Sequence, residues 1–424
     1  MTALLIGSFT LLFLLGWPVV LSILGPAIVY VLMNDLPIEL IGQRMAYAMD
    51  SFPLVAVPVF IFVGNLMNQA GVTERIFKFA DTLVGRVPGG LAQVNVVASL
   101  IFSGMSGAAL ADVGGLGRIE VKAMTARGFR KDFSSAVTVA SAIVGPIFPP
   151  SIPLIIYGSV TNVSIIQLLI AGIVPALICV ALLMITVVIL ALRRGYPRAE
   201  RWPTFGELWR DFVPAIPALV TPVLLVSGML LGVFTPTEAA SITVVYVLLI
   251  TAFVYRTLTL QHLLYATYET LKSTSAILVI VSVASLFGWI MAIEQIPQVF
   301  ARELLSFSKD PLVLLMITNV VLIIAGMFLD STTATLLIIP IISVPLHAAG
   351  VDPVHLGIVA IFNLMVGIVT PPMGLALFLI VDIAKVSMRS VLRELLPFYI
   401  PLVGTLLIIT FLPRLVLWLP KMMR

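Results

Sequence analysis

Charged residues and cysteine are scarce in this chain of 424 residues. Asp, Glu, Lys and Arg make up only 10% of the sequence and 60% of it is hydrophobic, whereas a soluble domain carries roughly 25% charged residues. This composition excludes a water-soluble fold. The single cysteine, Cys179, lies inside the apolar run from Leu177 to Leu192, so a disulfide framework is excluded as well.

Sequence motifs of nucleotide hydrolysis and of hydrolytic enzymes are also missing. The chain has no G-x-x-x-x-G-K-[ST] loop, no H-E-x-x-H, no G-x-S-x-G and no Cys/His metal cluster. Its basic residues lie between apolar runs rather than along one face, which indicates membrane topology and not a nucleic-acid footprint. We therefore expect no enzymatic activity, no cofactor and no nucleic-acid partner.

Long apolar runs are what the chain does contain. A helical span needs roughly 20 apolar residues, so we predict an all-α polytopic membrane protein in the lipid bilayer, with about ten spans. Two further apolar stretches, 89–117 and 311–350, are interrupted by small polar residues and predict re-entrant helical hairpins. The predicted spans are 2–15, 18–33, 52–70, 133–160, 165–192, 212–232, 238–255, 273–293, 353–381 and 395–418.

The sequence repeats itself at one fixed offset, which is the separation between Gly104 and Gly326. At this repeat offset the segment from Leu100 to Met105 matches that from Leu322 to Met327, both at the hydrophobic pairs and at the glycine. Farther along, Val144-Gly145 and Pro149-Pro150 match Val366-Gly367 and Pro371-Pro372 at the same offset. The chain is therefore predicted to hold two copies of one unit.

Charge placement predicts that the two copies have opposite orientations in the membrane. Segment 118–131 carries five basic residues, whereas its counterpart 340–353 carries none. Conversely, 381–389 contains Lys385 and Arg389, whereas its counterpart 159–167 has no Lys or Arg. Basic loops remain in the cytoplasm, so equivalent loops face opposite sides and the repeats are inverted.

Each repeat contains two segments that a regular helix cannot accommodate. Small and hydroxyl residues interrupt the hairpins at 102–113 and 325–334, and the diproline segments 145–151 and 367–373 break the spans that follow. Inverted repeats with broken helices are typical of secondary transporters, whose sites form at the bilayer midplane. Freed carbonyls and hydroxyls suit Na⁺, and one oxygen cage per repeat predicts two sodium sites. Close helix packing and simple proline kinks are the alternative explanations.

Several other polar features allow more than one interpretation. Segments 73–86 and 296–308 are amphipathic and too short to span, so they are either surface anchors or arms that link a fixed part to a moving part. Asp112 and Asp330 are functional or structural with equal weight. Glu238 follows Thr235-Pro-Thr and is a candidate helix cap, and Asp382 is a candidate ion-pair partner of Lys385.

Six segments taken together resemble one transporter family. They include the stretch from Arg86 to Val96, Phe148 to Pro153, and Phe234 to Ala240. They continue with Gly326 to Asp330, Asp352 to Gly357, and Gly367 to Gly374. In this order they are similar to the large membrane subunit, of the dicarboxylate-type branch, of tripartite ATP-independent periplasmic (TRAP) transporters. The resemblance covers nearly the whole chain.

The resemblance implies a multi-pass protein of the bacterial cytoplasmic membrane that imports an organic acid, coupled to Na⁺, by an elevator mechanism. It also implies two partners, a small four-helix membrane subunit and a periplasmic substrate-binding protein. C4-dicarboxylates and sialic acid are among the carboxylates expected as substrates. A stand-alone anion carrier without a binding protein is the alternative. A structural or signalling protein without transport is a third possibility, and it predicts that bulky replacements of Gly326 or Thr370 leave all sodium-dependent behaviour intact.

The sodium sites follow from the same resemblance. Many relatives have a hydroxyl residue where this chain has Ala108, so no hydroxyl ligand is expected there. The first sodium site is carried over to Ser103, Ser106, Gly145, Phe148 and Pro150, most of them acting through carbonyl oxygens. The second is carried over to Gly326, Gly367, Thr370 and Met373. Candidate substrate contacts are Ser141, Asp330, Ser331, Thr332 and Asn363.

These expectations divide the chain into fixed and moving parts. We expect 1–88 to hold scaffold helices and the first arm, and 163–310 to hold scaffold helices, the cytoplasmic linker and the second arm. The transport domain then consists of two halves, 89–162 and 311–383, each with a hairpin and a broken helix. Residues 384–424 complete the scaffold as a C-terminal helix.

Overall fold

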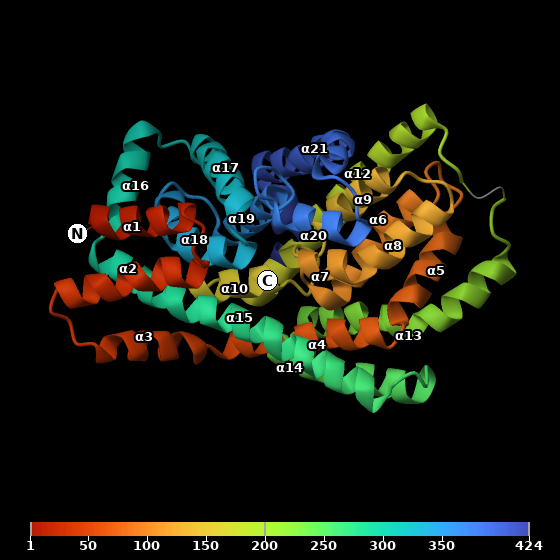
Figure 1. Cartoon of the computed structure of the whole chain (residues 1–424), viewed down its shortest axis with the longest axis horizontal. Coiled ribbons are helices and arrows are strands. Elements are labelled where there is room, and N and C mark those ends of the chain that lie inside the picture. The colour runs from red at the N-terminus through yellow and green to blue at the C-terminus, as the bar shows by residue number, and fades with distance from the viewer. Residues whose placement is uncertain (1, 199–200, 423–424) are drawn as a thin grey trace.

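The computed structural model describes residues 2–198 and 201–422, and within these ranges all regular elements are helices (Figure 1). Eight helices or helix pairs in this part of the chain are long and apolar enough to cross a membrane. The predicted all-α polytopic fold class is therefore confirmed. Four of the ten predicted spans are built from shorter helices, and the two limbs of the second hairpin reach spanning length instead.

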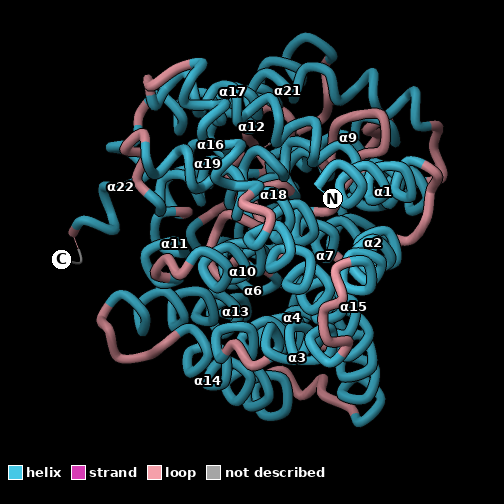
Figure 2. Tube along the Cα trace, turned by 90° about the vertical axis from the view of Figure 1, so that its left-hand side faces the viewer, coloured by secondary structure: helices cyan, strands magenta, loops and turns pink. Residues whose placement is uncertain are grey.

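One side of the molecule is a layer of helices gathered around the long helix α15 (Figures 1 and 2). Helix α15 packs against α2, α3 and α4, and α14 packs against α4 and α13. This layer consists of α1 (Thr2–Leu14), α2 (Val19–Met33), α3 (Glu39–Met49), η1 (Phe52–Val55), α4 (Ala56–Gln69), α13 (Phe205–Leu230), α14 (Pro236–Leu249), the π-helical turn η2 (Ile250–Val254) and α15 (Leu260–Ile293).

The opposite side holds the two hairpins and the broken helices. The first hairpin comprises α6 (Leu91–Ser106), α7 (Ala109–Gly114) and α8 (Leu116–Ala126), followed by the broken helix α9 (Lys131–Ala142) and α10 (Ile152–Thr161). The second comprises α17 (Pro311–Phe328) and α18 (Ser331–Ala348), followed by α19 (Pro353–Gly367) and α20 (Leu375–Ala384). Helices α11 (Ile165–Ala171), α12 (Ile173–Arg194), α21 (Met388–Phe411) and α22 (Pro413–Lys421) complete this side.

The sequence repeat is visible in where the helices begin. Helices α7 and α18 begin at Ala109 and Ser331, and α9 and α19 begin at Lys131 and Pro353, so both pairs of starts are separated by the repeat offset. The contacts are reciprocal, because α10 packs on α18 of the other repeat and α20 packs on α7. The repeats differ at Gly115, where the second limb of the first hairpin is split into α7 and α8 while α18 is continuous.

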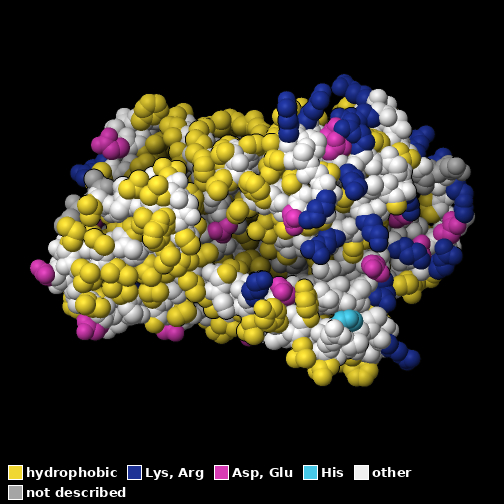
Figure 3. Space-filling view, in the orientation of Figure 1, with side chains coloured by type: hydrophobic (Ala, Val, Ile, Leu, Met, Phe, Trp, Pro, Cys, Tyr) yellow, Lys and Arg dark blue, Asp and Glu magenta, His cyan; other side chains and the backbone are white. Residues whose placement is uncertain are grey.

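Basic residues gather at one end of the molecule, over α8, α9 and the end of α12 (Figures 1 and 3). At this end a surface pocket is lined by Arg118 and Lys122 of α8, by Lys131, and by Asp382 and Lys385 of the second repeat. Loop 118–131 and loop 381–389 are not equivalent in the repeat, yet they lie side by side. That arrangement is what two inverted copies require.

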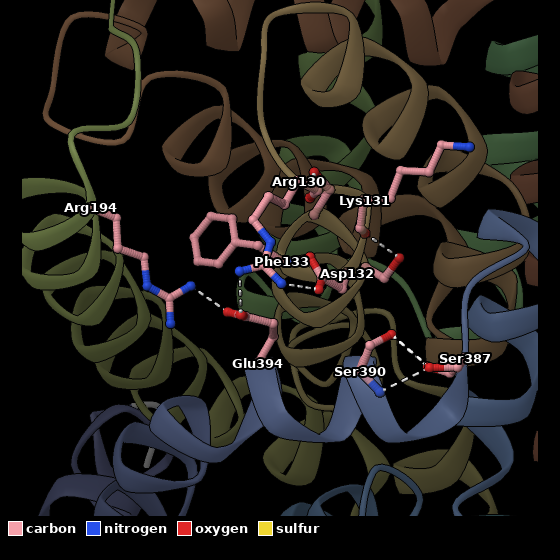
Figure 4. A network of polar contacts seen from close by, with 10 residues as sticks. Arg130, Lys131, Asp132, Phe133, Arg194, Ser387, Ser390 and Glu394 are labelled. Carbon is pink, nitrogen blue, oxygen red and sulfur yellow. Dashed lines mark hydrogen bonds and ion pairs between the residues drawn. The ribbon is translucent and has the colours of Figure 1, made fainter.

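Helix α21 joins elements from both halves of the repeat. It packs against α9, α12 and α19, and it carries Glu394, which is only 4% exposed. The Glu394 carboxylate forms ion pairs with Arg194 at the end of α12 and, at 3.5 Å, with Arg130 just before α9 (Figure 4). These contacts place α12 and α21 beside the hairpins, whereas the prediction from sequence assigned both to the scaffold.

Several helices differ from the predictions. Helix α3 has no predicted counterpart, because it has no fully buried residue and too few apolar ones to stand out as a run. Helix α15 starts at Leu260, well before the predicted residue 273. The prediction missed its first turns because they are polar and do not stand out as an apolar run. The last predicted span, 395–418, ends at Phe411, where Pro413 prevents the helix from continuing.

The two amphipathic segments form α5 (Val72–Val84) and α16 (Ile296–Phe307). Helix α5 packs on α13 of the α15 layer and on α6 of the first hairpin. Helix α16 follows α15 directly and packs on α18 of the second hairpin. Each therefore connects the two sides of the molecule, as an arm would.

Candidate functional site

The first predicted sodium site, cage 1, consists of Ser103, Ser106, Gly145, Phe148 and Pro150, and the structure brings its segments together. Helix α6 ends at Ser106 because Gly107 adopts a left-handed conformation, with φ of 63°. A Cβ added to Gly107 would lie 2.5 Å from the carbonyl oxygen of Pro150, and one added to Gly145 would lie 3.6 Å from the carbonyl carbon of Ala108. The hairpin tip thus lies directly against the diproline loop.

The polar atoms of cage 1 differ in how they are satisfied. The Ser103 hydroxyl donates to the carbonyl oxygen of Leu100 at 2.6 Å. The Ser106 hydroxyl, by contrast, is buried and has no hydrogen-bond partner within the described residues. The Phe148 ring lies beside Gly104, because a Cβ added there would lie 3.5 Å from the ring. An unpartnered hydroxyl beside bent backbone is a feature expected of an oxygen cage.

The second predicted site, cage 2, consists of Gly326, Gly367, Thr370 and Met373. A Cβ added to Gly367 would lie 2.5 Å from the Cα of Gly326, so the two backbones touch where α17 crosses α19. The Thr370 hydroxyl donates to the carbonyl oxygen of Val366 at 2.6 Å. Met373 is 45% exposed.

In both repeats one backbone hydrogen bond links the hairpin tip to the broken helix, from equivalent donors to acceptors that are not equivalent. The amide of Ile152 donates to the carbonyl oxygen of Gly107 at 3.2 Å, and the amide of Gly374 donates to that of Met327 at 3.2 Å. Ile152 and Gly374 are separated by the repeat offset and are therefore equivalent. In both repeats the X-Pro bond inside the diproline pair is cis. Each predicted cage thus lies where a hairpin tip meets a helix break.

A central cavity of about 550 Å³ lies between the hairpin tips and the α15 layer. The hairpin side contributes Ser106, Ala108, Asp330, Ser331 and Thr332. Pro146 and Ile368 come from the two helix breaks. The surface is hollowed between α7 and α15 in this region (Figure 3). Four predicted site residues therefore share one cavity: Ser106 from cage 1, and Asp330, Ser331 and Thr332 from the substrate set.

Asp330 has a structural function at this cavity. Its carboxylate accepts hydrogen bonds from the amides of Thr332 at 2.9 Å and Thr333 at 3.1 Å, which caps the first turn of α18. The Thr333 hydroxyl also donates to the same carboxylate. This geometry accounts for Asp330 as a helix cap, and its exposed part still lines the cavity.

Ser141 and Asn363, the other two predicted substrate contacts, are equivalent positions that do not line this cavity. The Ser141 hydroxyl donates to the side-chain oxygen of Asn95 at 2.8 Å, and the Asn363 amide donates to that of Asn319 at 2.9 Å. Both side chains are fully buried between α9 and α6 or between α19 and α17. In this structure they connect helices through buried hydrogen bonds.

The side of the cavity formed by the α15 layer carries polar residues that the sequence did not single out. Asn65, Asn68 and Gln69 come from α4, and Tyr265 and Glu269 come from α15. They lie within helices and have no counterpart motif, so only the packing of α4 and α15 against the hairpin tips identifies them. The cavity lining contains no Lys or Arg.

Two other predicted acids have ordinary structural functions. Glu238 and Thr235 form a reciprocal cap at the start of α14, with the Glu238 carboxylate accepting from the Thr235 amide at 2.8 Å. Asp382 pairs with Lys385 at 2.7 Å, and both side chains are about three-quarters exposed, at 76% and 77%. Neither lies at the central cavity.

Inverted repeats, broken helices and a central cavity between them are typical of membrane transporters of the secondary class. The chain matches the family model described as "Tripartite ATP-independent periplasmic transporter, DctM component" over residues 6–415. The chain therefore belongs to this family and is a transporter permease, not an enzyme.

Individual relatives agree with this assignment. The chain is 43% identical to the sialic acid TRAP transporter large permease protein SiaM of Vibrio cholerae, over 96% of this chain and 95% of that protein. It is 32% identical to the C4-dicarboxylate TRAP transporter large permease protein DctM of Rhodobacter capsulatus, over the full length of both. The predicted resemblance to TRAP large membrane subunits is thus confirmed.

A solved structure shares the overall fold. The YdaH transporter of Alcanivorax borkumensis superposes with a TM-score of 0.64 at 15% identity, covering 96% of this chain and 98% of that one. At this level of identity the likeness concerns the arrangement of helices alone.

Proposed function

We propose that this permease imports an organic acid across the cytoplasmic membrane, driven by Na⁺ bound at cage 1 and cage 2. The observation that carries the proposal is the duplicated meeting of a hairpin tip with a helix break, joined in each repeat by one backbone hydrogen bond, whose donors Ile152 and Gly374 are equivalent. Non-helical backbone inside a membrane is tolerated only where it is buried in protein or lines a cavity. The unpartnered hydroxyl of Ser106 supports a bound ion at cage 1.

The helix contacts support movement by an elevator mechanism. We propose that α6–α12 and α17–α22 move as one unit against the layer of α1–α4 and α13–α15. This unit is larger than the predicted halves 89–162 and 311–383, because α12 and α21 pack on α9 and α19 rather than on the α15 layer. Helices α5 and α16 would act as its arms.

The driving force of two sodium ions is sufficient for accumulation. Two Na⁺ ions moving down about 100 mV release roughly 4.6 kcal/mol. This free energy sustains about a two-thousandfold gradient of an uncharged substrate. A substrate with one carboxylate charge enters against the same potential at a cost of about 2.3 kcal/mol, which leaves roughly a fiftyfold gradient from the potential alone. The concentration gradient of sodium adds to this figure.

The substrate proposed for the central cavity is a carboxylate that also carries hydroxyl or amide groups. The lining offers Asn65, Asn68 and Gln69 on one side and the Ser331 and Thr332 hydroxyls on the other. Such groups match a polyhydroxylated acid better than a small dicarboxylate, because the lining has no Lys or Arg for a second carboxylate. The relatives named for sialic acid and for C4-dicarboxylates represent these two alternatives.

We further propose that the chain works with a small four-helix membrane subunit and a periplasmic binding protein. The tripartite description of its family supports this. A stand-alone carrier would transport substrate without either partner.

Uptake into proteoliposomes tests the proposal. Liposomes holding the permease and the small subunit are given binding protein loaded with a candidate acid, with an inward Na⁺ gradient or an equal choline gradient. We expect uptake under the Na⁺ gradient and none under the choline gradient. Equal uptake in choline would reject sodium coupling, and full uptake without the binding protein would favour the stand-alone carrier.

A further inference from the structure

Two acidic side chains inside the first hairpin have no partner. Asp112 of α7 is 2% exposed and Glu120 of α8 is 1% exposed. All four of their carboxylate oxygens are buried and accept no hydrogen bond within the described residues. The two carboxyl groups are close enough to interact electrostatically, and Asn95, Ser99 and Thr138 lie around them. A buried charge without a partner is among the costliest features that a fold can contain.

The repeat shows that the fold does not require these acids. The equivalent positions of the second repeat are Ala334 and Ile342, which are buried at corresponding places in α18. One copy of the unit therefore carries two buried acids, and the other has apolar side chains at the same two positions. This difference indicates a site added to the first repeat rather than a property of the fold.

No cation neutralises the pair within the described part of the chain. Helices α4 and α6 contain no titratable residue, and on α9 Lys131 is exposed and Asp132 pairs with Arg130. On α20, Asp382 pairs with Lys385 at the surface. Arg118 and Lys122 of α8 itself are exposed and line the basic surface pocket, away from the pair. Neither Asp112 nor Glu120 forms an ion pair with any of these groups.

The surrounding oxygens are poorly suited to a metal ion. The side-chain oxygen of Asn95 already accepts from Ser141, and the Thr138 hydroxyl oxygen accepts from the Asn95 amide at 2.7 Å. No group of three or more His, Cys, Asp and Glu side chains suited to a metal occurs among the described residues. A hard cation needs roughly six oxygen ligands, whereas a proton needs only the two carboxyl groups. Two carboxyl groups at one site share a proton because both cannot ionise together.

We propose that Asp112 and Glu120 form a proton-binding site in the moving unit, with at least one proton held by the pair at neutral pH. The site is separate from cage 1 and cage 2 and does not depend on sodium coupling. Asp112 is one turn beyond the hairpin tip at Gly107–Ala108, so the proton would travel with the hairpin. Loss of the proton would leave two adjacent negative charges inside the first hairpin, near its tip.

Infrared spectroscopy of the purified permease in lipid tests this directly. A protonated carboxyl group gives a carbonyl stretching band that an ionised one lacks, and the band shifts in heavy water. We expect such a band at neutral pH in the wild type. At least one of the two single variants, Asp112→Asn and Glu120→Gln, should lose it. Asp382→Asn, which alters an exposed paired acid, is the matched control and should leave the band unchanged.

The result that would overturn the proposal is a wild-type spectrum without any such band at neutral pH, or a band that neither substitution removes. If the single variants fail to fold, Asp112→Ala with Glu120→Ile installs the residues of the second repeat and should also lose the band. The wild-type band should in addition weaken as the medium is made strongly alkaline. A band that persists unchanged in the folded double variant would refute the assignment.

Discussion

Individual glycines allow the broken helices to approach the hairpin tips. Gly326 and Gly367 are in backbone contact, and Gly367 has no room for a methyl group, since a Cβ there would meet the Gly326 Cα at 2.5 Å. Backbone cannot rotate away as a flexible side chain can. The close contact at cage 2 therefore depends on glycine at this position.

We predict that Gly367→Ala separates α17 from α19. Overpacking of this kind costs about 1–3 kcal/mol, and cage 2 should lose most of its sodium affinity. Thermal unfolding with and without Na⁺ measures both effects. Gly288→Ala on α15 is the control, because a Cβ there meets nothing within 4 Å. A Gly367→Ala protein with wild-type stabilisation by sodium would contradict this account of cage 2.

The two serines of cage 1 give a second comparison at the residue scale. The Ser106 hydroxyl is buried without a partner, whereas the Ser103 hydroxyl is satisfied by its own helix. We predict that Ser106→Ala raises the Na⁺ concentration needed for half-maximal uptake at least several-fold with little loss of stability, and that Ser103→Ala changes it far less. Sodium titration of uptake measures both. Equal effects of the two substitutions would argue against a hydroxyl ligand at Ser106.

The sequence predicted some of these residues and not others. Glycines and diprolines are conspicuous in an apolar chain, so the cages could be proposed before the structure was known. Ser141 and Asn363 were chosen as polar residues in apolar surroundings, and the structure places them in buried contacts between helices. Asn65 and Glu269 were not predicted to line the cavity, because a polar residue within a helix does not indicate which part of the protein that helix faces.

At the scale of elements, Glu394 holds three helix ends together. It is buried, and its two partners, Arg130 and Arg194, come from α9 and α12 (Figure 4). Removal of its charge would leave the Arg194 guanidinium without this counterion, whereas Arg130 would keep its ion pair with Asp132. The contacts therefore make Glu394 the connection between α21 and the first repeat.

We predict that Glu394→Gln destabilises the permease by about 1.5–3 kcal/mol, the range for a hydrogen bond to a charged group. A fall in the midpoint of thermal unfolding measures it. Asp382→Asn removes an exposed pair and should lower the midpoint far less. The interpretation fails if the two substitutions shift the midpoint equally.

The helix order and the repeat were predictable, but the grouping of the helices was not. Starts of α18 and α19 follow those of α7 and α9 at the predicted offset, because the same helix breakers recur. Hydropathy and charge give the depth of a helix and the side on which its ends lie. They do not reveal its neighbours, so the packing of α12 on α6 and of α21 on α9 is known only from the structure.

At the scale of the whole molecule, the central cavity separates the proposed moving unit from the α15 layer. Leu110 of α7 and Ile277 of α15 line it from opposite sides. We predict that cysteines at these two positions, joined by a short bifunctional maleimide, abolish uptake. Cys179 is buried, so the native thiol adds little background.

A second pair of cysteines, within the α15 layer, serves as the control. Tyr30 and Glu294 lie on α2 and at the end of α15, and their side chains are 2.6 Å apart. Linking these two positions should leave uptake in place, because both belong to the same rigid part. Transport that survives the link between Leu110→Cys and Ile277→Cys would exclude movement of one side past the other.

The central claim is that each repeat contributes one sodium site. The most direct measurement is the number of Na⁺ ions moved with each substrate, obtained from the reversal potential of uptake in proteoliposomes with both partner proteins. Two sites predict a stoichiometry of at least two Na⁺ per substrate, lowered in Gly367→Ala. A ratio of one or none in the wild type would contradict the account.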